Sequence, residues 1–221
     1  MVIMCFDLSS TCIGVVTAKI NENKVEKILS CPIAPINFDV SSLGFMPSKK
    51  KLPTKKGELL NTYVKLGETQ ITKSEKEKRD TLVRSQKDVH VLASISKSIS
   101  NLVDNIKPDI IIVEKNAIFN GILTSILLAK ILGILHGLAG RLGIEVKEYS
   151  VNKVRSIINV GKLIRDFSKD KTDCELKSIP DITKRALGDM MTKEYGIRFK
   201  TDDESDACVV FHYYFKEIYN K

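Results

Sequence analysis

Short apolar runs rich in β-branched residues alternate with polar turns in the first part of the chain. Met1 to Leu8, Cys12 to Ile20 and Lys24 to Pro32 predict three β-strands joined by short turns, as in an antiparallel meander. Two later segments predict two more strands: Ile110 to Glu114 is an apolar run that predicts a buried strand, and Glu145 to Tyr149 predicts the fifth strand.

Helical periodicity fills most of the remainder. Apolar residues recur at three- and four-residue steps from about Glu75 to Asn105, and Pro108 ends that helix. Ile182 to Tyr195 and Cys208 to Tyr219 predict two helices near the C-terminal end. The order of elements predicts an α/β fold with a mixed five-stranded sheet, three antiparallel strands and then two parallel ones, flanked by helices. We expect the first strand at its centre.

The segment from Asn120 to Arg141 is apolar on nearly every side. Its length suits a membrane span, but Lys130 and His136 interrupt it and the sequence contains no second span. Glycines mark places of close approach at Gly133, Gly137 and Gly140. We therefore favour a helix buried at a subunit interface and expect no membrane.

Carboxylates stand where the predicted elements would bring them together. Asp7 and Glu114 each end an apolar run, and Asp203 and Asp206 share one face of the last helix because they are three apart. Ligands gather at strand ends in such sheets, so we expect these four acids to meet. Carboxylate oxygens in this arrangement suit one or two divalent metal ions.

Each acid also has a structural interpretation. Asp7 could cap a strand end, Glu114 could be a surface glutamate, and Asp203 with Asp202 could form the N-cap of the last helix. Asp206 is harder to explain in this way. Four acids in five positions beside an apolar helix cost stability, which favours the metal site.

Positive charge lies elsewhere in the chain. The net charge of +8 is typical of a protein that binds a polyanion, and nucleic acid is the first candidate. From Pro32 to Lys56 the sequence has no apolar periodicity and contains prolines and lysine runs, which predicts a loop or arm. This segment is either a solvated insertion or a segment that contacts DNA phosphates. The five cysteines form no C-x-x-C pair, and the opening apolar run is too short for a signal peptide. We expect reduced thiols and a cytoplasmic protein.

Four segments, in their order and spacing, resemble those of the RuvC-like Holliday-junction resolvases of the ribonuclease H-like superfamily. They are Phe6 to Gly14, Lys107 to Glu114, Tyr149 to Arg155 and Asp203 to Ala207. The resemblance implies one nuclease domain over residues 1–221, with a lysine-rich insertion at about 32–75 and a second insertion at about 162–178. A bacteriophage-encoded member, acting in the host cytoplasm, is included in this expectation.

The resemblance also implies an activity. Members of the family are homodimers that bind four-way DNA junctions in recombination and repair, and they nick two opposed strands with two Mg²⁺ ions, or Mn²⁺ in their place, in each active site. Asp7, Glu114, Asp203 and Asp206 match the four metal-binding acids of the family. Neither a cleavage sequence nor branch-migration partner proteins are carried over, and other branched DNA is a further expected substrate.

Several residues are candidates for contacts with DNA. Asn152, Lys153 and Arg155 follow the fifth strand, and Lys184 and Arg185 begin a helical stretch, so these side chains could contact phosphates that flank the scissile bond. Arg155 and Lys184 fall where the family carries basic residues important for activity. The family also stacks an aromatic residue on unpaired junction bases, and Phe119 is the candidate here. The structural alternatives are a solvated surface charge and, for Phe119, an ordinary core or interface aromatic.

Other functions stay open from the residues alone. Another ribonuclease H-like nuclease, which cuts RNA-DNA hybrid or duplex, would share the acids without the dimer-forming helix. A non-catalytic junction-binding protein would use the basic surface and have the acids as caps. An actin-like ATPase, suggested by Asp7 to Gly14, would need a second matching half that 221 residues do not hold.

Overall fold

The computed structural model of the protein describes residues 1–9, 11–47, 52–53, 59–60, 63–65, 71–115, 122–156, 158, 162–163 and 179–219. The chain forms two compact units. The first comprises Met1–Ala34 and Ile95–Lys221, and the second comprises Pro35–Ser94. The predicted site residues that the structure describes belong to the first unit, and the expectation of one nuclease domain with two insertions stays a prediction.

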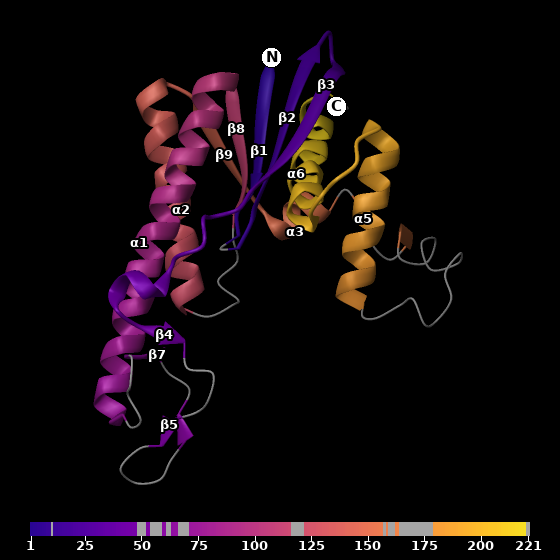
Figure 1. Cartoon of the computed structure of the whole chain (residues 1–221). Helices are drawn as coiled ribbons and strands as arrows, with labels where there is room; N and C mark the ends of the chain where they lie inside the picture. The colour runs from indigo at the N-terminus through magenta and orange to yellow at the C-terminus, as the bar shows by residue number, and fades with distance from the viewer. Residues whose placement is uncertain are drawn as a thin grey trace. The chain divides into compact units, whose positions relative to one another are not determined.

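A five-stranded mixed sheet forms the centre of the first unit (Figure 1). Its strands are β1 (Val2–Asp7), β2 (Ile13–Asn21), β3 (Lys24–Ile33), β8 (Ile110–Lys115) and β9 (Glu145–Ser150). The order across the sheet is β3-β2-β1-β8-β9. β1, β2 and β3 are antiparallel, whereas β1, β8 and β9 are parallel. The predicted fold class is confirmed, with the first strand at the centre.

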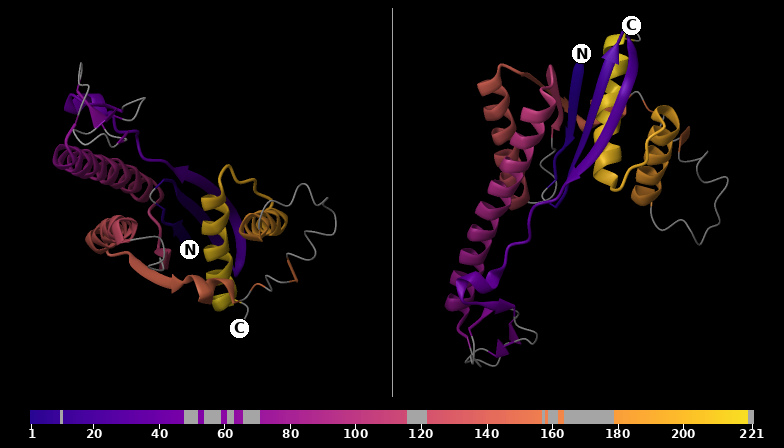
Figure 2. Two further views of the ribbon diagram at one scale, coloured as in Figure 1. Left: turned by 90° about the horizontal axis from the view of Figure 1, so that it is seen from below. Right: turned by 45° about the horizontal axis from the view of Figure 1, so that its top comes forward.

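Helices cover both faces of this sheet. They are α1 (Lys73–Ile106), α2 (Ile122–Leu142), α3 (Val151–Arg155), α5 (Ile179–Tyr195) and α6 (Asp202–Tyr219). Within the first unit, α2 and the C-terminal part of α1 lie on one side of the sheet and α6 on the other, with α5 outside α6 (Figure 2). The predicted helices are confirmed, and their ends shift by a few residues.

The main core lies between the sheet and α6. Ile3 and Cys5 from β1 and Ile110 and Ile112 from β8 are buried in it. The α6 residues of this core are Ala207, Cys208, Val209, Val210, Phe211, Tyr213 and Tyr214. Because side chains alternate along a strand, every second residue of β1 and β8 faces α6.

The N-terminal end of α6 carries a capping box. The Thr201 hydroxyl accepts a hydrogen bond from the backbone N–H of Glu204 at 3.3 Å, and the Glu204 carboxylate accepts from the backbone N–H groups of Thr201 at 2.9 Å and Lys200 at 2.7 Å. The interpretation of Asp203 with Asp202 as the N-cap is therefore wrong, because Thr201 fills that role. Both aspartates lie in the first turn, where the helix dipole favours negative charge.

α2 is the most apolar helix of the part of the chain that the structure describes. It alone among those helices has the length and composition of a membrane span, and only 22% of its most apolar window is buried. Its buried residues are Ile131, Leu135, Leu138 and Ala139. One such helix is a weak indication of a membrane, because core helices and interface helices share this composition.

The second unit contains short elements where the sequence predicted a loop or arm. They are η1 (Val40–Leu43), β4 (Met46–Pro47) paired with β7 (Tyr63–Val64), and β5 (Leu52–Pro53) paired with β6 (Leu59–Leu60). Within it the Arg79 guanidinium donates to the Tyr63 carbonyl at 3.2 Å and lies 5.5 Å from the centre of the Phe45 ring. Strands of two residues are too short to show alternation, so periodicity could not reveal them. The lysine runs at 49–51 and 55–56 lie outside the described residues.

Candidate functional site

β1 and β8 deliver two acids to one edge of the sheet. The strands are parallel neighbours, and Phe6 pairs with Val113, so Asp7 and Glu114 are the next residues on each strand. Both follow the alternation of the residues that pack against α6, and therefore both point to the face that α6 covers. Parallel strands thus bring together two carboxylates that are 107 positions apart in the sequence.

Gly14 allows the first turn of α6 to close on this edge. Gly14 pairs with Asp7 across the β1–β2 ladder. A Cβ atom at Gly14 would lie 1.8 Å from the backbone oxygen of Asp203 and 2.6 Å from the backbone nitrogen of Glu204. Only a glycine permits this approach. It holds the Asp203 backbone beside the strand position that pairs with Asp7.

The charges of neighbouring acids act on the pKa of Asp7. The pKa of Asp7 is raised well above its usual range, first by burial and then by the negative charges of Asp206, Glu114 and Asp203, while the Lys184 ammonium acts in the opposite direction. Each of the other three predicted acids therefore contributes to the electrostatic field at Asp7. The fold brings all four of them into one neighbourhood.

Glu114 and Asp206 show the same effect. Burial raises the pKa of Glu114 to about 7, the nearby Arg155 guanidinium opposes this rise, and Asp206 adds to it. Burial also raises the pKa of Asp206, against the opposing charges of Lys184 and Arg155. Carboxylates whose pKa values rise together in a partly enclosed site are typical of functional centres.

Two of the predicted basic residues lie beside this cluster. Arg155 is the last residue of α3 and acts electrostatically on both Glu114 and Asp206. Lys184 lies on α5, and its ammonium nitrogen is 3.8 Å from Oδ2 of Asp206. Both side chains are positioned to balance negative charge at the cluster, whether that charge comes from the acids or from a bound anion.

The ligand chemistry of the cluster fits a hard divalent cation. Its side chains offer carboxylate oxygens, which Mg²⁺ and Mn²⁺ prefer, and a cation would relieve the repulsion that raises these pKa values. In the part of the chain that the structure describes, no three His, Cys, Asp or Glu side chains stand close enough to hold one ion. The fit rests on ligand type, burial and repulsion, and the predicted metal site stays a prediction.

Lys153, one of the predicted DNA contacts, has partners inside the protein. Its ammonium nitrogen lies 3.1 Å from the Glu217 carboxylate, 4.8 Å from the centre of the Tyr149 ring and 5.7 Å from that of Tyr213. The Tyr149 hydroxyl also donates to Glu217 at 2.6 Å. These contacts join α3 and β9 to α6, so Lys153 has a structural role whatever it does with DNA.

The remaining candidates are less informative. Asn152 is exposed on α3, and Phe119 lies outside the described residues. Sequence reasoning assigned no role to Gly14 and missed the capping box, although both have recognisable signals. A glycine inside an apolar strand indicates close backbone approach, and Thr-x-x-Glu before an apolar run indicates a capping box.

No protein-family model matches the sequence, and no curated protein matches it. Among solved structures, T. thermophilus RuvC in complex with a Holliday junction substrate is similar with a TM-score of 0.53, at 11% identity over 98% of this chain and 95% of that one. The fold is that of RuvC. A second structure of Thermus thermophilus RuvC gives a TM-score of 0.50 at 11% identity, again over 98% of this chain and 95% of that one.

The yeast mitochondrial Holliday junction resolvase is a more distant neighbour, with a TM-score of 0.42 and 13% identity over 97% of this chain and 78% of that one. The likeness to RuvC shows that the chain has the same fold as that protein. At such low identity it establishes the fold alone, and the function must be argued from the site.

Proposed function

We propose that this protein is a metal-dependent, structure-selective DNA endonuclease that resolves four-way (Holliday) junctions, and other branched DNA, by paired nicks. The observation that supports the proposal is the half-buried cluster of Asp7, Glu114, Asp203 and Asp206 at one edge of a RuvC-type sheet. A fold gains no stability from crowding these carboxylates, so their function must lie in what they bind. The net charge of +8 suits a DNA substrate.

The chain's own residues have distinct roles in this proposal. Two Mg²⁺ ions, or Mn²⁺ in their place, would supply the positive charge that phosphodiester hydrolysis requires at the attacking, leaving and non-bridging oxygens. Asp7, next to all the other acids, would hold both ions, and Glu114 and Asp206 would each hold one. Asp203 would complete the ligand set or accept a proton from the attacking water. Arg155 and Lys184 would position the phosphates on either side of the reacting one.

Paired nicks require two active sites, and α2 offers a surface for a second copy of the chain. Ile122 is 77% exposed, Leu123 57% and Ile126 46%. Glycines with open space around them continue this face along the helix at Gly133, Gly137 and Gly140. An exposed apolar helix face of this kind gains stability when it is buried against a partner, so we propose a homodimer formed through α2.

Cleavage of a synthetic four-way junction tests the proposed activity. We expect symmetric nicks in Mg²⁺ or Mn²⁺ by the wild type, and a loss of about a thousandfold or more for Asp7→Asn and Asp206→Asn, because several kcal/mol of charge stabilisation depend on these ligands. Both variants should still bind the junction. Binding without cutting by the wild type would refute the proposal. Better cutting of RNA-DNA hybrid or linear duplex would favour another nuclease of this fold.

Light scattering of the purified protein tests the dimer. Ile126→Glu places a charge in the exposed face of α2, and we expect it to shift the mass from dimer to monomer. Leu29→Glu is the matched control, because Leu29 is also apolar and 55% exposed but lies on β3. A wild-type protein that is monomeric at micromolar concentration, or equal behaviour of the two variants, would argue against the α2 interface.

A further inference from the structure

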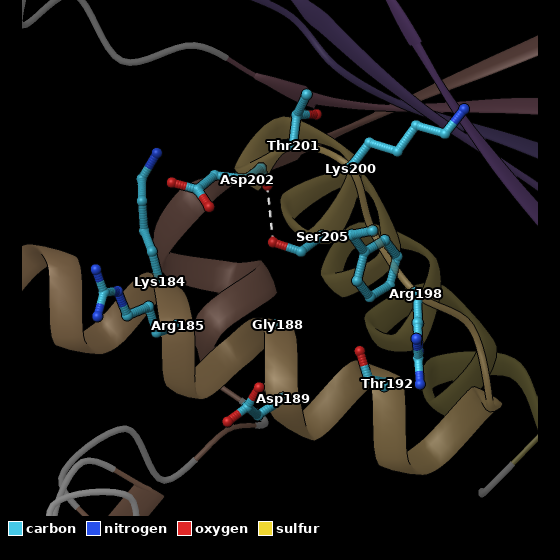
Figure 3. A pocket seen from close by; sticks show the side chains of 11 residues that line it. Lys184, Arg185, Gly188, Asp189, Thr192, Arg198, Lys200, Thr201, Asp202 and Ser205 are labelled. Atoms are coloured by element: carbon cyan, nitrogen blue, oxygen red, sulfur yellow. Dashed lines mark hydrogen bonds between the residues drawn. The ribbon is translucent and has the colours of Figure 1, made fainter. Parts of the chain in front are cut away.

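A cavity of about 430 Å³ lies between α5 and the N-terminal end of α6 (Figure 3). On the α5 side it is lined by Lys184, Arg185 and Asp189, and on the other side by Arg198, Lys200 and Asp202. Figure 3 shows Lys184, Arg185 and Asp202 toward one end of the cavity and Arg198 toward the other. Of these residues, Lys184 and Arg185 were expected from the sequence to contact phosphates, and the other four were not.

The walls of this cavity select for an anion. The six side chains named above include four cations and two acids, so the walls carry two more positive than negative charges. Hydroxyl groups of Thr192, Thr201 and Ser205 also line it, and Phe199 is the one large apolar side chain in the lining. Pockets for apolar small molecules are lined mainly by apolar and aromatic residues, which this cavity lacks. The Ser205 hydroxyl donates to the Asp202 carbonyl and the Thr201 hydroxyl to the Glu204 carboxylate, so the groups that suit a phosphate ester are the cations and the Thr192 hydroxyl.

The cavity is continuous with the acidic cluster. Lys184 lines the cavity, and its ammonium nitrogen is 3.8 Å from Asp206, one of the four clustered acids. The first turn of α6 likewise contributes Asp202 to the cavity and Asp203 to the cluster. A DNA strand whose phosphate lies at the acids can therefore place a neighbouring phosphate in the cavity.

Gly188 forms the floor between the two helices. A Cβ atom there would meet the Ser205 side chain at 3.7 Å, which is ordinary van der Waals contact. Ser205 is 3% exposed, and its hydroxyl donates to the Asp202 carbonyl at 2.8 Å. The floor is thus formed by packed residues of α5 and α6, so the walls are held by two helices.

We propose that this cavity is a phosphate-binding cleft that holds a backbone phosphodiester of the DNA strand next to the reacting one. The inference rests on the proposed nuclease function for the identity of the strand. The same phosphate-ester chemistry could come from a free nucleotide, and the experiment below separates the two sources. The volume is within the range of about 300 to 1,000 Å³ that small-ligand sites occupy, so it accommodates a nucleotide unit.

Binding without cleavage measures the cleft directly. Fluorescence anisotropy with a labelled four-way junction in EDTA, at several salt concentrations, compares the wild type with the double variant Arg185→Gln, Arg198→Gln. We expect the double variant to bind about tenfold or more weakly. Its slope of log K against log salt should be shallower by roughly 0.7 to 0.9 for each DNA phosphate that it no longer neutralises. Its thermal unfolding should match that of the wild type, because both arginines are exposed.

A second comparison removes a negative charge from the cleft and therefore predicts the opposite change in junction binding. Asp189→Asn removes an acid from the same wall, and we expect it to tighten junction binding. Lys193→Gln is the matched control, because Lys193 is an exposed cation of α5 that does not line the cavity, and we expect little change. The assignment of this cavity as a phosphate-binding cleft would be overturned if Lys193→Gln weakened junction binding as much as Arg198→Gln. It would also be overturned if neither Asp189→Asn nor the double variant changed junction binding.

Deoxythymidine monophosphate distinguishes the two sources of phosphate. Competition by this nucleotide at micromolar concentration, with unchanged junction binding in the double variant, would overturn the assignment to a DNA strand. The outcomes also separate the cleft from the nuclease proposal. If the wild type binds junctions without cutting them and the double variant binds weakly, the cleft stands and the proposed cleavage fails. If the double variant binds and cuts like the wild type, the cleft fails and the cleavage stands.

Discussion

Carboxylates lie near both ends of α6, and their surroundings act on them in opposite ways. At the N-terminal end, Asp7 and Glu114 are half-buried beside other acids, and their pKa values are raised. Near the C-terminal end, Glu217 accepts hydrogen bonds from the hydroxyls of Tyr149 at 2.6 Å and Tyr213 at 3.0 Å, and these bonds, with the Lys153 ammonium, lower its pKa. The acids at the N-terminal end repel one another, whereas Glu217 has hydrogen-bond donors and a cation as partners.

The difference separates function from structure within one helix. A carboxylate that receives two hydroxyl donors and a cation stabilises the fold by itself. Carboxylates that raise one another's pKa values destabilise the fold until a cation or a proton arrives. The comparison predicts that substitutions of the carboxylates at the two ends of α6 change stability in opposite directions when no metal is present.

The largest effect is expected at Gly14, which allows the acidic end to form. Gly14→Ala would place a Cβ atom 1.8 Å from the Asp203 backbone, so α6 must move. We expect a loss of about 3 kcal/mol or more in the free energy of unfolding, and about a hundredfold or more in junction cleavage, because the acids are displaced from one another. Urea unfolding and single-turnover cleavage measure the two effects.

Gly188→Ala is the control for that substitution. Its Cβ atom would meet only the Ser205 side chain, at 3.7 Å, and Gly188 lies inside α5. Alanine in a helix interior is favoured over glycine, so we expect a gain of about 0.5 to 1 kcal/mol in stability. A comparable loss of stability in Gly14→Ala and Gly188→Ala would mean that the acidic end does not depend on the close approach at Gly14.

The next effect is the pH dependence of stability without metal. The pKa of Glu114 is raised from 4.5 to about 7 in the folded protein, so its favourable contribution is complete below about pH 4.5 and is lost as the pH rises through 7. In EDTA we expect Glu114→Gln to be more stable than the wild type at pH 8, by about 1 to 3 kcal/mol, with little difference at pH 4.5. Urea unfolding across this range measures it, and lower stability of the variant at pH 8 would contradict the account.

A smaller effect of opposite sign is expected at Glu217. Its pKa is lowered in the folded protein, so its contribution is present above about pH 4.5 and is lost as the pH falls. Glu217→Ala removes the acceptor of both tyrosine hydroxyls, and we expect a loss of about 1 to 2 kcal/mol at pH 8. Glu217→Gln should lose less because it keeps one acceptor oxygen. If either variant were more stable than the wild type at pH 8, the carboxylates at the two ends of α6 would not differ in their effect on stability.

The smallest effect concerns the cap that starts α6. Thr201→Ala removes the hydroxyl that accepts from the Glu204 N–H, and we expect a loss of about 1 kcal/mol. Thr201→Ser keeps that hydroxyl and should be close to the wild type. Circular dichroism of thermal unfolding compares the two variants, and equal losses would show that the cap does not depend on the hydroxyl.

Local patterns were sufficient to predict the five strands of the main sheet and the long helices. Alternation and β-branching located the strands that carry Asp7 and Glu114, and three- and four-residue steps located the helices, because these periods follow from backbone geometry alone. The two-residue strands of the second unit were missed because they are shorter than any period. The cap was assigned to Asp202 and Asp203 rather than Thr201 because acids and hydroxyls are both good caps, and sequence alone does not show which accepts the bond.

By itself the sequence determined the main elements, the fold class that their order along the chain predicts and the residue types of the site, because the elements depend on neighbours a few positions away. Only the tertiary structure decided that Gly14 touches the Asp203 backbone, that Arg155 and Lys184 reach the acids, and that Lys153 is held by Glu217. It also decided that α5 and α6 enclose a cationic cavity. These contacts join segments that are distant in the sequence. They depend on how the helices pack on the sheet, and a local sequence pattern does not contain that information.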